Sequence, residues 1–475
     1  MTDKIKKTAF EWIDKNRERL IEISDAIWEY AELGFIEFKS AKLLADELES
    51  HGFEVERGVA GIPTAFVATW GDGKPVIGIN GEYDALPGIS NKTVPRQDPL
   101  VGGAPGHGCS HNIHGVSGLG GALGLKAAME TEAIPGTIKY FGCPAEEMLS
   151  GKVWMVRDGI YEGVDACISH HPFSFNGAGV GSTLANNSVK FHFYGRTAHA
   201  AGSPEQGRSA LDAVELMNVG VNYMREHIIE KARIHYVIEE GGGQPNVVPD
   251  YARVWYLVRA PERDQVDHIY DWVSRIAEGA ALMTGTTHKV ELAKAIYNLL
   301  PNRTLAELVI ANMRKVGAPE YTEEELEFAR KIGETVSKRA KIDGLRAYSV
   351  PNWENYVDVD LVTDILDPWD EGKVMPGSTD VSDVSWNTPT TEFYTTGSVL
   401  GSPGHSRRTI ATSGMSIGHK SLIFAAKAMA GATLDLMTDA DLLKKAQEEY
   451  RNRLAGRKYK TPLPPDAKPP LDQWT

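Results

Sequence analysis

Cysteine is scarce in this chain of 475 residues, which contains only three: Cys109, Cys143 and Cys167. A small, odd number of cysteines excludes a disulfide framework. No apolar run approaches the roughly 18 residues of a membrane span, and the charged N-terminal stretch lacks the apolar core of a secretory signal. We therefore expect a protein of the reducing cytoplasm with no membrane partner.

Basic residues are also under-represented. The chain has 50 Lys and Arg against 64 Asp and Glu, a formal net charge of −14. A phosphate backbone is bound by clustered Lys and Arg, so we expect no nucleic-acid partner. The length exceeds the roughly 250–300 residues at which a single core stops growing, which predicts two domains or one large domain with an insertion.

Several catalytic motifs are missing. No His is followed by Glu, which excludes an H-E-x-x-H zinc helix, and there is no G-x-S-x-G nucleophile elbow. The stretch GLGGALG at 118–124 has the wrong spacing, and no strand before it, for a dinucleotide loop. We interpret its small residues as positions where a helix packs closely against a sheet.

What is present is an alternation of short β-rich runs and helical patterns over residues 40–171. This alternation predicts an α/β fold, with a mostly parallel sheet flanked by helices. In such sheets the active site lies beyond the carboxyl ends of the strands. Four reactive side chains fall at these ends: Asp84, Glu146, Glu147 and His171.

The pattern changes near residue 186. From there to residue 297 the order is strand, helix, strand, strand, helix, strand, which describes a ferredoxin-like α+β unit. We predict that 186–297 is an inserted lid or dimerisation domain. Residues 1–185 and 298–475 then form the catalytic, metal-binding domain.

The segment GHGCSHNIHG at 106–115 places a thiol among three imidazoles. If the segment is extended, the side chains of Cys109 and His111 point the same way and can reach one ion. Thiolate sulfur and imidazole nitrogen both suit zinc and its first-row neighbours. On this spacing alone, a glycine-rich turn that happens to carry imidazoles is the better interpretation.

Further candidate ligands follow in CPAEE and SHHP. Glu146 and Glu147 are adjacent, so one can bind a metal ion while the other takes a proton from water. Only one of His170 and His171 can face a site, because neighbours on a strand face opposite sides. The rival hypothesis is a Cys109 nucleophile with a histidine base, which has no use for the two glutamates.

Seven motifs in order carry a family resemblance: GHGCSHN, CPAEE, HHP, GRTAHAA, PNVVP, GSTDVSDVSW and GSPGHS. With them the chain resembles the aminoacylase/carboxypeptidase-like di-metal amidohydrolases, in the subgroup of hippurate and auxin-conjugate hydrolases. The resemblance covers nearly the whole chain. It implies a metal-dependent enzyme that cleaves the amide bond of an N-acyl or N-aroyl amino acid, such as p-aminobenzoyl-glutamate.

The resemblance also implies two divalent metal ions per subunit, Mn or Zn, with Ni as a further candidate. Cys109 would bridge the two ions as a thiolate, a soft ligand that favours these metals over Mg. His111 and Glu147 would complete one metal site, and His171 and His405 the other. His405 is preferred to His419, which lies in a helical pattern.

The remaining roles come from the same resemblance. Glu146 would be the general base; Asp84, by contrast, is assigned from its position in GEYDALPG, as a residue that would orient a ligand histidine. His199 would polarise the scissile carbonyl, reaching across a homodimer into the partner's site. Asn246 and Arg259 would hold the substrate carboxylate or the oxyanion. An A-type subunit is a further partner that the resemblance suggests.

Two features depart from the family pattern. The family has Gly where Ser110 stands, and its members carry an aromatic residue where Arg407 and Arg408 follow His405. The two arginines either recognise an acidic substrate or are simply solvated, and the sequence does not decide between these interpretations.

Overall fold

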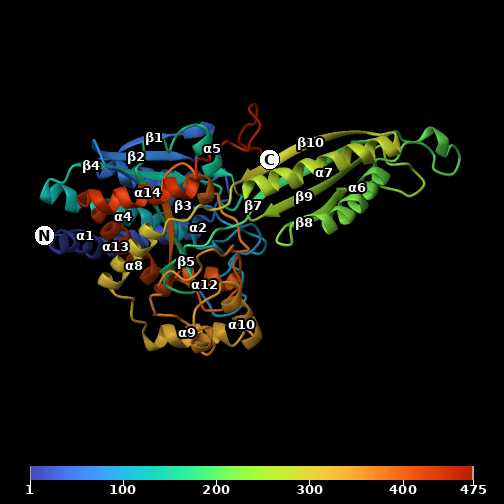
Figure 1. Cartoon of the computed structure of the whole chain (residues 1–475). Coiled ribbons are helices and arrows are strands. Elements are labelled where there is room, and N and C mark those ends of the chain that lie inside the picture. Colours follow the sequence, from blue (N-terminus) through green and yellow to red (C-terminus); the bar gives the residue numbers. More distant parts are fainter. Residues whose placement is uncertain (1, 149, 473–475) are drawn as a thin grey trace.

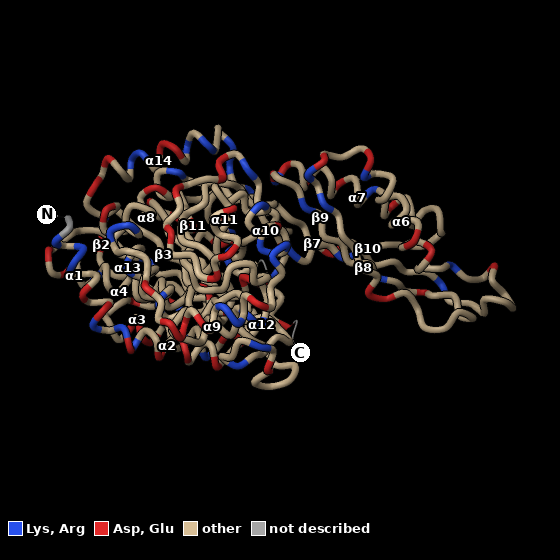
Figure 2. Tube along the Cα trace, turned by 90° about the horizontal axis from the view of Figure 1, so that it is seen from below, with Lys and Arg blue, Asp and Glu red and all other residues tan. Residues whose placement is uncertain are grey.

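The computed structural model describes residues 2–148 and 150–472, which form two units. The larger unit contains a seven-stranded sheet, and the smaller contains a four-stranded sheet. The smaller unit projects from the side of the larger in both views (Figures 1 and 2). Figure 2 shows Lys and Arg interspersed with Asp and Glu along both units.

The seven-stranded sheet has the order β1-β2-β4-β3-β5-β11-β6. Its four central strands β4, β3, β5 and β11 run parallel, whereas β1, β2 and β6 join antiparallel at the two edges. The expected α/β fold is confirmed, with a mixed rather than uniformly parallel sheet. The strands are β1 (Glu54–Arg57), β2 (Phe66–Asp72), β3 (Val76–Glu82), β4 (Gly136–Cys143), β5 (Ala166–Phe173), β6 (Gly177–Ala178) and β11 (Thr390–Thr396).

Helices cover both faces of this sheet. One face packs against α4, α13, α8 and the three N-terminal helices, and the other packs against α5. The helices of this unit are α1 (Thr2–Lys15), α2 (Arg17–Tyr30), α3 (Phe38–Ser50), α4 (His111–Glu132), α5 (Gly151–Arg157), α8 (Arg303–Val316), α9 (Glu323–Gly333), α10 (Lys338–Ala347), α11 (Val381–Ser385), α12 (Arg407–Ser413), α13 (Ser416–Thr438) and α14 (Ala440–Leu454). Among the described residues, no helix is both long and apolar enough to cross a bilayer.

The small unit has four antiparallel strands in the order β10-β7-β9-β8. Helices α6 and α7 cover one face of this sheet. This is the expected ferredoxin-like arrangement. Its elements are β7 (Ala185–Tyr194), α6 (Ala210–Met224), β8 (Arg233–Glu240), β9 (Tyr251–Ala260), α7 (Arg263–Thr284) and β10 (Thr287–Ile296).

The glycine-rich stretch lies inside α4, where it allows close packing as predicted. A Cβ on Gly118 would lie 3.0 Å from the carbonyl oxygen of Asn80 in β3 and 3.1 Å from the ring of Tyr140 in β4. One turn further along the same helix, a Cβ on Gly121 would lie 2.9 Å from the sulfur of Met429 in α13. The stretch is therefore a packing surface that lets α4 approach the sheet.

The substitution Gly118→Val should lower the free energy of unfolding by about 1–3 kcal/mol, because the added methyl groups overpack this contact. Urea unfolding measures the loss. Gly279→Val is the matched control, since nothing lies within 4 Å of a Cβ at that position of α7. Equal stability of the two variants would contradict the packing interpretation.

Candidate metal centre

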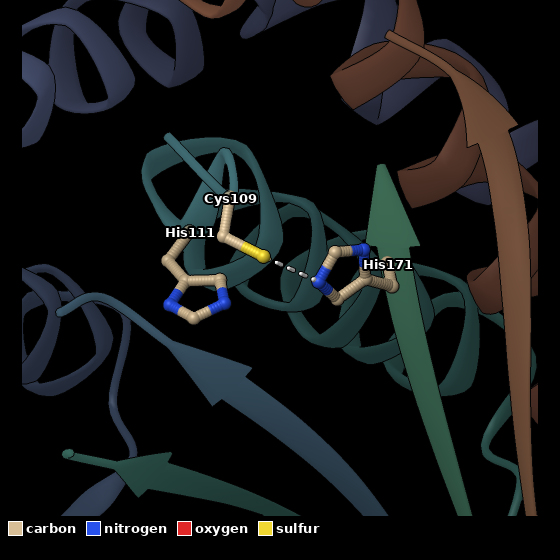
Figure 3. Close-up of side chains that lie close together, drawn as sticks. All are labelled: Cys109, His111 and His171. Carbon is tan, nitrogen blue, oxygen red and sulfur yellow. Dashed lines mark hydrogen bonds between the residues drawn. The ribbon is translucent and has the colours of Figure 1, made fainter. Parts of the chain in front are cut away.

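Five predicted metal ligands come together beyond the carboxyl ends of the parallel strands. Cys109 Sγ lies 3.3 Å from His171 Nε2. Figure 3 shows the thiol of Cys109 pointing toward His171 of β5, with the His111 ring beside it. His405 Nε2 lies 3.2 Å from Glu147 Oε2. Two strand ends, the start of α4 and the loop before α12 therefore deliver all five side chains to one place.

The segment around Cys109 is not extended, so the geometric reason given for the Cys109–His111 pairing is wrong. Ser110 has a φ of 62°, in the left-handed region, and His111 is the first residue of α4. A turn into the helix brings the thiol and the imidazole together. The same φ fits the glycine that the family resemblance implies at position 110, since glycine adopts this conformation with least strain.

His111 is oriented by Asp84, as predicted. Its Nδ1–H donates to Asp84 Oδ1 at 2.8 Å, so the lone pair of Nε2 points the other way. Nε2 is buried and has no hydrogen-bond partner among the described residues. Although burial opposes the charged ring, Asp84 and Cys109 raise the pKa of His111 well above its ordinary value. The surroundings of this nitrogen thus attract a cation.

The two glutamates sit on a turn that buried carboxylates hold in place. Ala145, with a φ of 58°, donates its N–H to Glu37 Oε1 at 2.8 Å, and Glu147 donates its N–H to Asp84 Oδ2 at 2.9 Å. Burial and the charges of Glu82 and Asp380 raise the pKa of Glu146 well above its ordinary value. A carboxylate in such surroundings readily takes up a proton.

The two adjacent histidines face opposite sides of β5, as the strand geometry requires. His170 is buried and makes hydrogen bonds of 2.7 Å to the hydroxyls of Ser117 and Thr395. His171 faces Cys109 instead. His419 lies in α13 and contacts Asp25 at 2.8 Å. His170 and His419 are therefore engaged elsewhere, which leaves His171 and His405 at the cluster.

The donor atoms fit a metal centre. Two ligands that each lie about 2.0–2.3 Å from a zinc ion are at most about 4.6 Å apart. In the part of the chain that the structure describes, three groups of side chains have donor atoms within 4.8 Å of one another, and Cys109 belongs to two of them. Buried Glu147 Oε1, like His111 Nε2, has no hydrogen-bond partner among the described residues. The groups are Cys109–His111–His171, Cys109–Glu147–His405 and Glu82–His111–Glu146.

These groups pair the ligands differently from the partition that the family resemblance implies. His111 is grouped with His171, and Glu147 with His405. Cys109 is common to both groups, which is the position expected of a bridging ligand. The assignment of each side chain to one of two ions stays a prediction.

The contact between Cys109 and His171 is also what a thiol nucleophile would need. Burial and Glu147 raise the pKa of the Cys109 thiol above its ordinary value. Burial and His111 lower the pKa of His171 to about 4. The neutral thiol and neutral imidazole are therefore favoured over the thiolate–imidazolium pair that a cysteine hydrolase uses.

Two adjoining cavities open onto the cluster, with volumes of about 460 and 450 Å³, and Cys109, His171 and His405 line both. Phe173 is T-shaped against Phe175 and Tyr348, with ring centroids 4.9 Å apart in each pair. These three rings also line both cavities. The cluster thus has an aromatic wall.

The second cavity also contains the catalytic and substrate-binding candidates Glu146 and Arg259. Arg259 lies at the end of β9 next to the large unit, and its buried Nε has no hydrogen-bond partner among the described residues. The Arg259 guanidinium is thus free to bind an anionic group of a substrate.

The other two predicted site residues, His199 and Asn246, do not lie at the cluster. Ala200 N–H donates to the Asn246 carbonyl at 3.0 Å, so their loops are adjacent. The loop that contains His199 follows Tyr194, and the loop that contains Asn246 precedes Tyr251. These two tyrosines pair with each other at the end of the sheet opposite to Arg259. The eight residue steps from position 251 to 259 of β9 span about 26 Å. Within one chain, His199 and Asn246 are therefore remote from the metal centre.

Arg407 and Arg408 make hydrogen bonds to residues of the large unit, and neither lines the two cavities at the cluster. Arg407 donates to the carbonyl of Gly88 at 3.1 Å, and Arg408 donates to the carbonyl of Thr335 at 3.0 Å. Both arginines therefore connect loops of the large unit.

Three buried residues near the cluster were missed by sequence reasoning: Glu82, Lys152 and Asp380. Lys152 Nζ lies 2.6 Å from Glu82 Oε1 and 2.6 Å from Asp380 Oδ1. Glu82 precedes Asp84 by two positions at a strand end, which was a signal available in the sequence. Lys152 gave no such signal, because a lysine in a short helix is usually solvated.

Comparison with known proteins identifies the family. Residues 78–465 match the model of Peptidase family M20/M25/M40. The chain belongs to this family. It is 42% identical over 466 residues to the B-type subunit of p-aminobenzoyl-glutamate hydrolase from Escherichia coli (strain K12), covering 96% of this chain and 97% of that protein.

More distant relatives are consistent with this family assignment. The chain is 33% identical over 326 residues to Xaa-Arg dipeptidase of Mus musculus, covering 66% of this chain and 72% of that protein. A solved dinuclear metal-binding M20 peptidase from Bacillus subtilis has a TM-score of 0.56 at 17% identity, covering 90% of this chain and 99% of that one, and so shares the fold. The motif-based resemblance is confirmed, and the chain is a hydrolase of the M20 family.

Glu37 should make the stability of the metal-free protein depend on pH. Burial and Asp84 raise its pKa from the ordinary 4.5 to about 8. Between these values the folded protein holds a proton that the unfolded chain releases. The free energy of unfolding should therefore fall as pH rises through this window, by up to about 1.4 kcal/mol per pH unit.

Glu37→Gln should flatten this dependence, because the amide does not titrate. Urea unfolding at two pH values inside the window measures the slope. Exposed Glu49→Gln on α3 is the control and should keep the wild-type slope. An unchanged slope in Glu37→Gln would show that Glu37 ionises normally.

Proposed function

We propose that this enzyme is a two-metal amidohydrolase that cleaves the amide bond of an N-acyl or N-aroyl amino acid. The observation that carries this proposal is the position of the donor cluster between two cavities. Both cavities share an aromatic wall, and one of them also contains the Arg259 guanidinium. An amide at the cluster would place an aromatic acyl group against this wall and a carboxylate near Arg259.

The substrate proposed first is p-aminobenzoyl-glutamate, which the name of the Escherichia coli relative mentions. The rings of Phe173, Phe175 and Tyr348 suit an aroyl group, because aromatic pairs favour edge-to-face packing. Arg259 suits a glutamate carboxylate, since its planar guanidinium can bind both oxygens.

The proposed ligands are Cys109, His111, Glu147, His171 and His405. Two bound Mn or Zn ions, with Ni as a further candidate, would lower the pKa of a water molecule and stabilise negative charge on the scissile carbonyl. Cys109 would serve as a ligand rather than a nucleophile. Glu146 would accept the proton of the attacking water and pass it to the leaving amine, a role favoured by its raised pKa.

The lid at 186–297 is proposed to act from a second copy of the chain. His199 Nδ1 accepts the N–H groups of Ala201 and Gly202 at 3.2 and 3.1 Å, so the neutral ring carries its proton on Nε2. That exposed N–H could donate to a substrate carbonyl in the partner's site, where Asn246 would accompany it. An exposed apolar strip on edge strand β8, formed by Tyr236, Val237 and Ile238, offers a surface for a homodimer.

The cellular setting belongs to the same proposal. Cys109 must stay reduced to bind a metal, which fits the cytoplasm. The Escherichia coli relative is named as one type of subunit, the B type, and we therefore keep an A-type subunit as a further partner to test.

The enzyme loaded with Mn²⁺ or Zn²⁺ should release glutamate from p-aminobenzoyl-glutamate, and chelation with EDTA should abolish the activity. Glu146→Gln should lower kcat by about 100- to 10,000-fold with metal content unchanged, because general-base catalysis contributes that much. Activity assays and elemental analysis measure both effects. Activity that survives exhaustive chelation would favour the Cys109 nucleophile instead, and loss of metal from Glu146→Gln would exchange the roles of the two glutamates.

Mixing two inactive variants tests the action of the lid in trans. His199→Ala and Glu146→Gln homodimers should each be nearly inactive. In a mixed dimer, the chain with intact Glu146 receives His199 from its partner, so random mixing should restore about a quarter of the wild-type activity. Subunit exchange followed by an activity assay measures this, and His227→Ala, a lid histidine outside both site loops, is the control. No recovery in demonstrably mixed dimers would contradict the proposal.

A further inference from the structure

A lysine is fully buried directly behind the metal centre. The side chain of Lys152 has 0% exposure, and its Nζ lies 2.6 Å from both Glu82 Oε1 and Asp380 Oδ1. Its own N–H also donates to Asp380 Oδ2 at 2.8 Å. Three elements meet at this ammonium group: the end of β3, the start of α5 and the residue that precedes α11. A buried charge is tolerated only when paired in this way.

The other oxygen of Glu82 faces the metal centre. Glu82 Oε2 lies 3.4 Å from His111 Nε2 and 3.4 Å from His114 Nε2. His114 Nδ1 accepts the N–H of Glu82 at 3.0 Å, so the neutral His114 ring carries its proton on Nε2, toward this carboxylate. Glu82 is therefore held at one oxygen by an ammonium group and approached at the other by two imidazoles.

Glu82 is also one corner of the third group of potential ligands, with His111 and Glu146. An ion bound there would compete for His111, which the proposed centre needs as a ligand. It would also engage Glu146, which the proposed mechanism needs as a free base. A carboxylate with one oxygen neutralised by an ammonium group is a poor ligand for a further cation, because the cation and the ammonium repel each other.

We propose that Lys152 is a positioning residue: a built-in cation that keeps Glu82 from coordinating metal and so restricts the centre to two ions. The inference rests on the proposed two-metal function. It accounts for a lysine placed where the surrounding carboxylates would otherwise attract a third divalent ion. Lys152 acts through Glu82 and touches neither the ligand set nor the substrate cavities.

The test is the Mn²⁺ content of metal-loaded protein after dialysis. The wild type should hold two Mn²⁺ per chain. Lys152→Met, which keeps the length of the side chain without its charge, should hold three. Its kcat should fall by about 100-fold, because Glu146 is then engaged as a ligand. Removing the carboxylate as well, in Glu82→Gln/Lys152→Met, should return the content to two.

Lys6→Met is the matched control. Lys6 is likewise buried and ion-paired, with its Nζ 2.6 Å from Asp435 Oδ2 and 2.8 Å from Asn312 Oδ1, and it lines neither cavity. The variant should lose stability but keep two Mn²⁺ and the wild-type kcat. If the changes in Lys152→Met came only from the loss of a buried lysine, the same changes in Mn²⁺ content and kcat would appear in Lys6→Met.

Two Mn²⁺ per chain in folded Lys152→Met would overturn the inference while leaving the proposed function intact. A wild type that binds no Mn²⁺ or Zn²⁺ would overturn both. If Lys152→Met does not fold, Glu82→Gln alone decides. It should keep two Mn²⁺, because Glu82 is not a ligand, and loss of one ion would refute the proposal.

Discussion

Buried negative charge is the constraint on which the centre depends. Glu37, Glu82, Asp84, Glu146 and Asp380 are all buried. Charges removed from water must be paired, or they take up protons. Lys152 pairs with two of these carboxylates, and backbone N–H groups hold others in place. The negative charge that these contacts leave unpaired lies around Cys109 and its neighbours, which is where divalent cations are expected to bind.

The sheet explains why so many charges can meet. Strands β3, β4 and β5 run parallel and end side by side, so the residues that follow them share one edge. At that edge α4 begins with His111, after a left-handed residue that turns the chain sharply. The connection after β4 is short, and the hydrogen bonds that Ala145 and Glu147 donate to Glu37 and Asp84 restrict it further. The candidate site residues at this edge are thus positioned by the fold itself.

Much of this was predictable from the sequence, and the limits have physical causes. The strand ends located Asp84, Glu146 and His171. Alternation along β5 showed that only one of His170 and His171 could face the site, and the family resemblance indicated His171. The conformation around Cys109 was misjudged, because a left-handed serine has no sequence signature of its own. The buried position of Lys152 could not be predicted for another reason. A lysine is buried only when tertiary structure supplies its partners, here Glu82 and Asp380 from distant parts of the chain.

The small sheet limits which changes in the length of β9 would keep Arg259 in its position. A fixed number of residues along β9 separates Arg259 from Tyr251 at the other end of the strand. Removing one residue would turn the Arg259 side chain to the opposite face, since side chains alternate along a strand. Removing two would keep the face but shorten the strand by about 6.6 Å. A deletion in this strand would therefore keep the direction of the Arg259 side chain only if it removed an even number of residues.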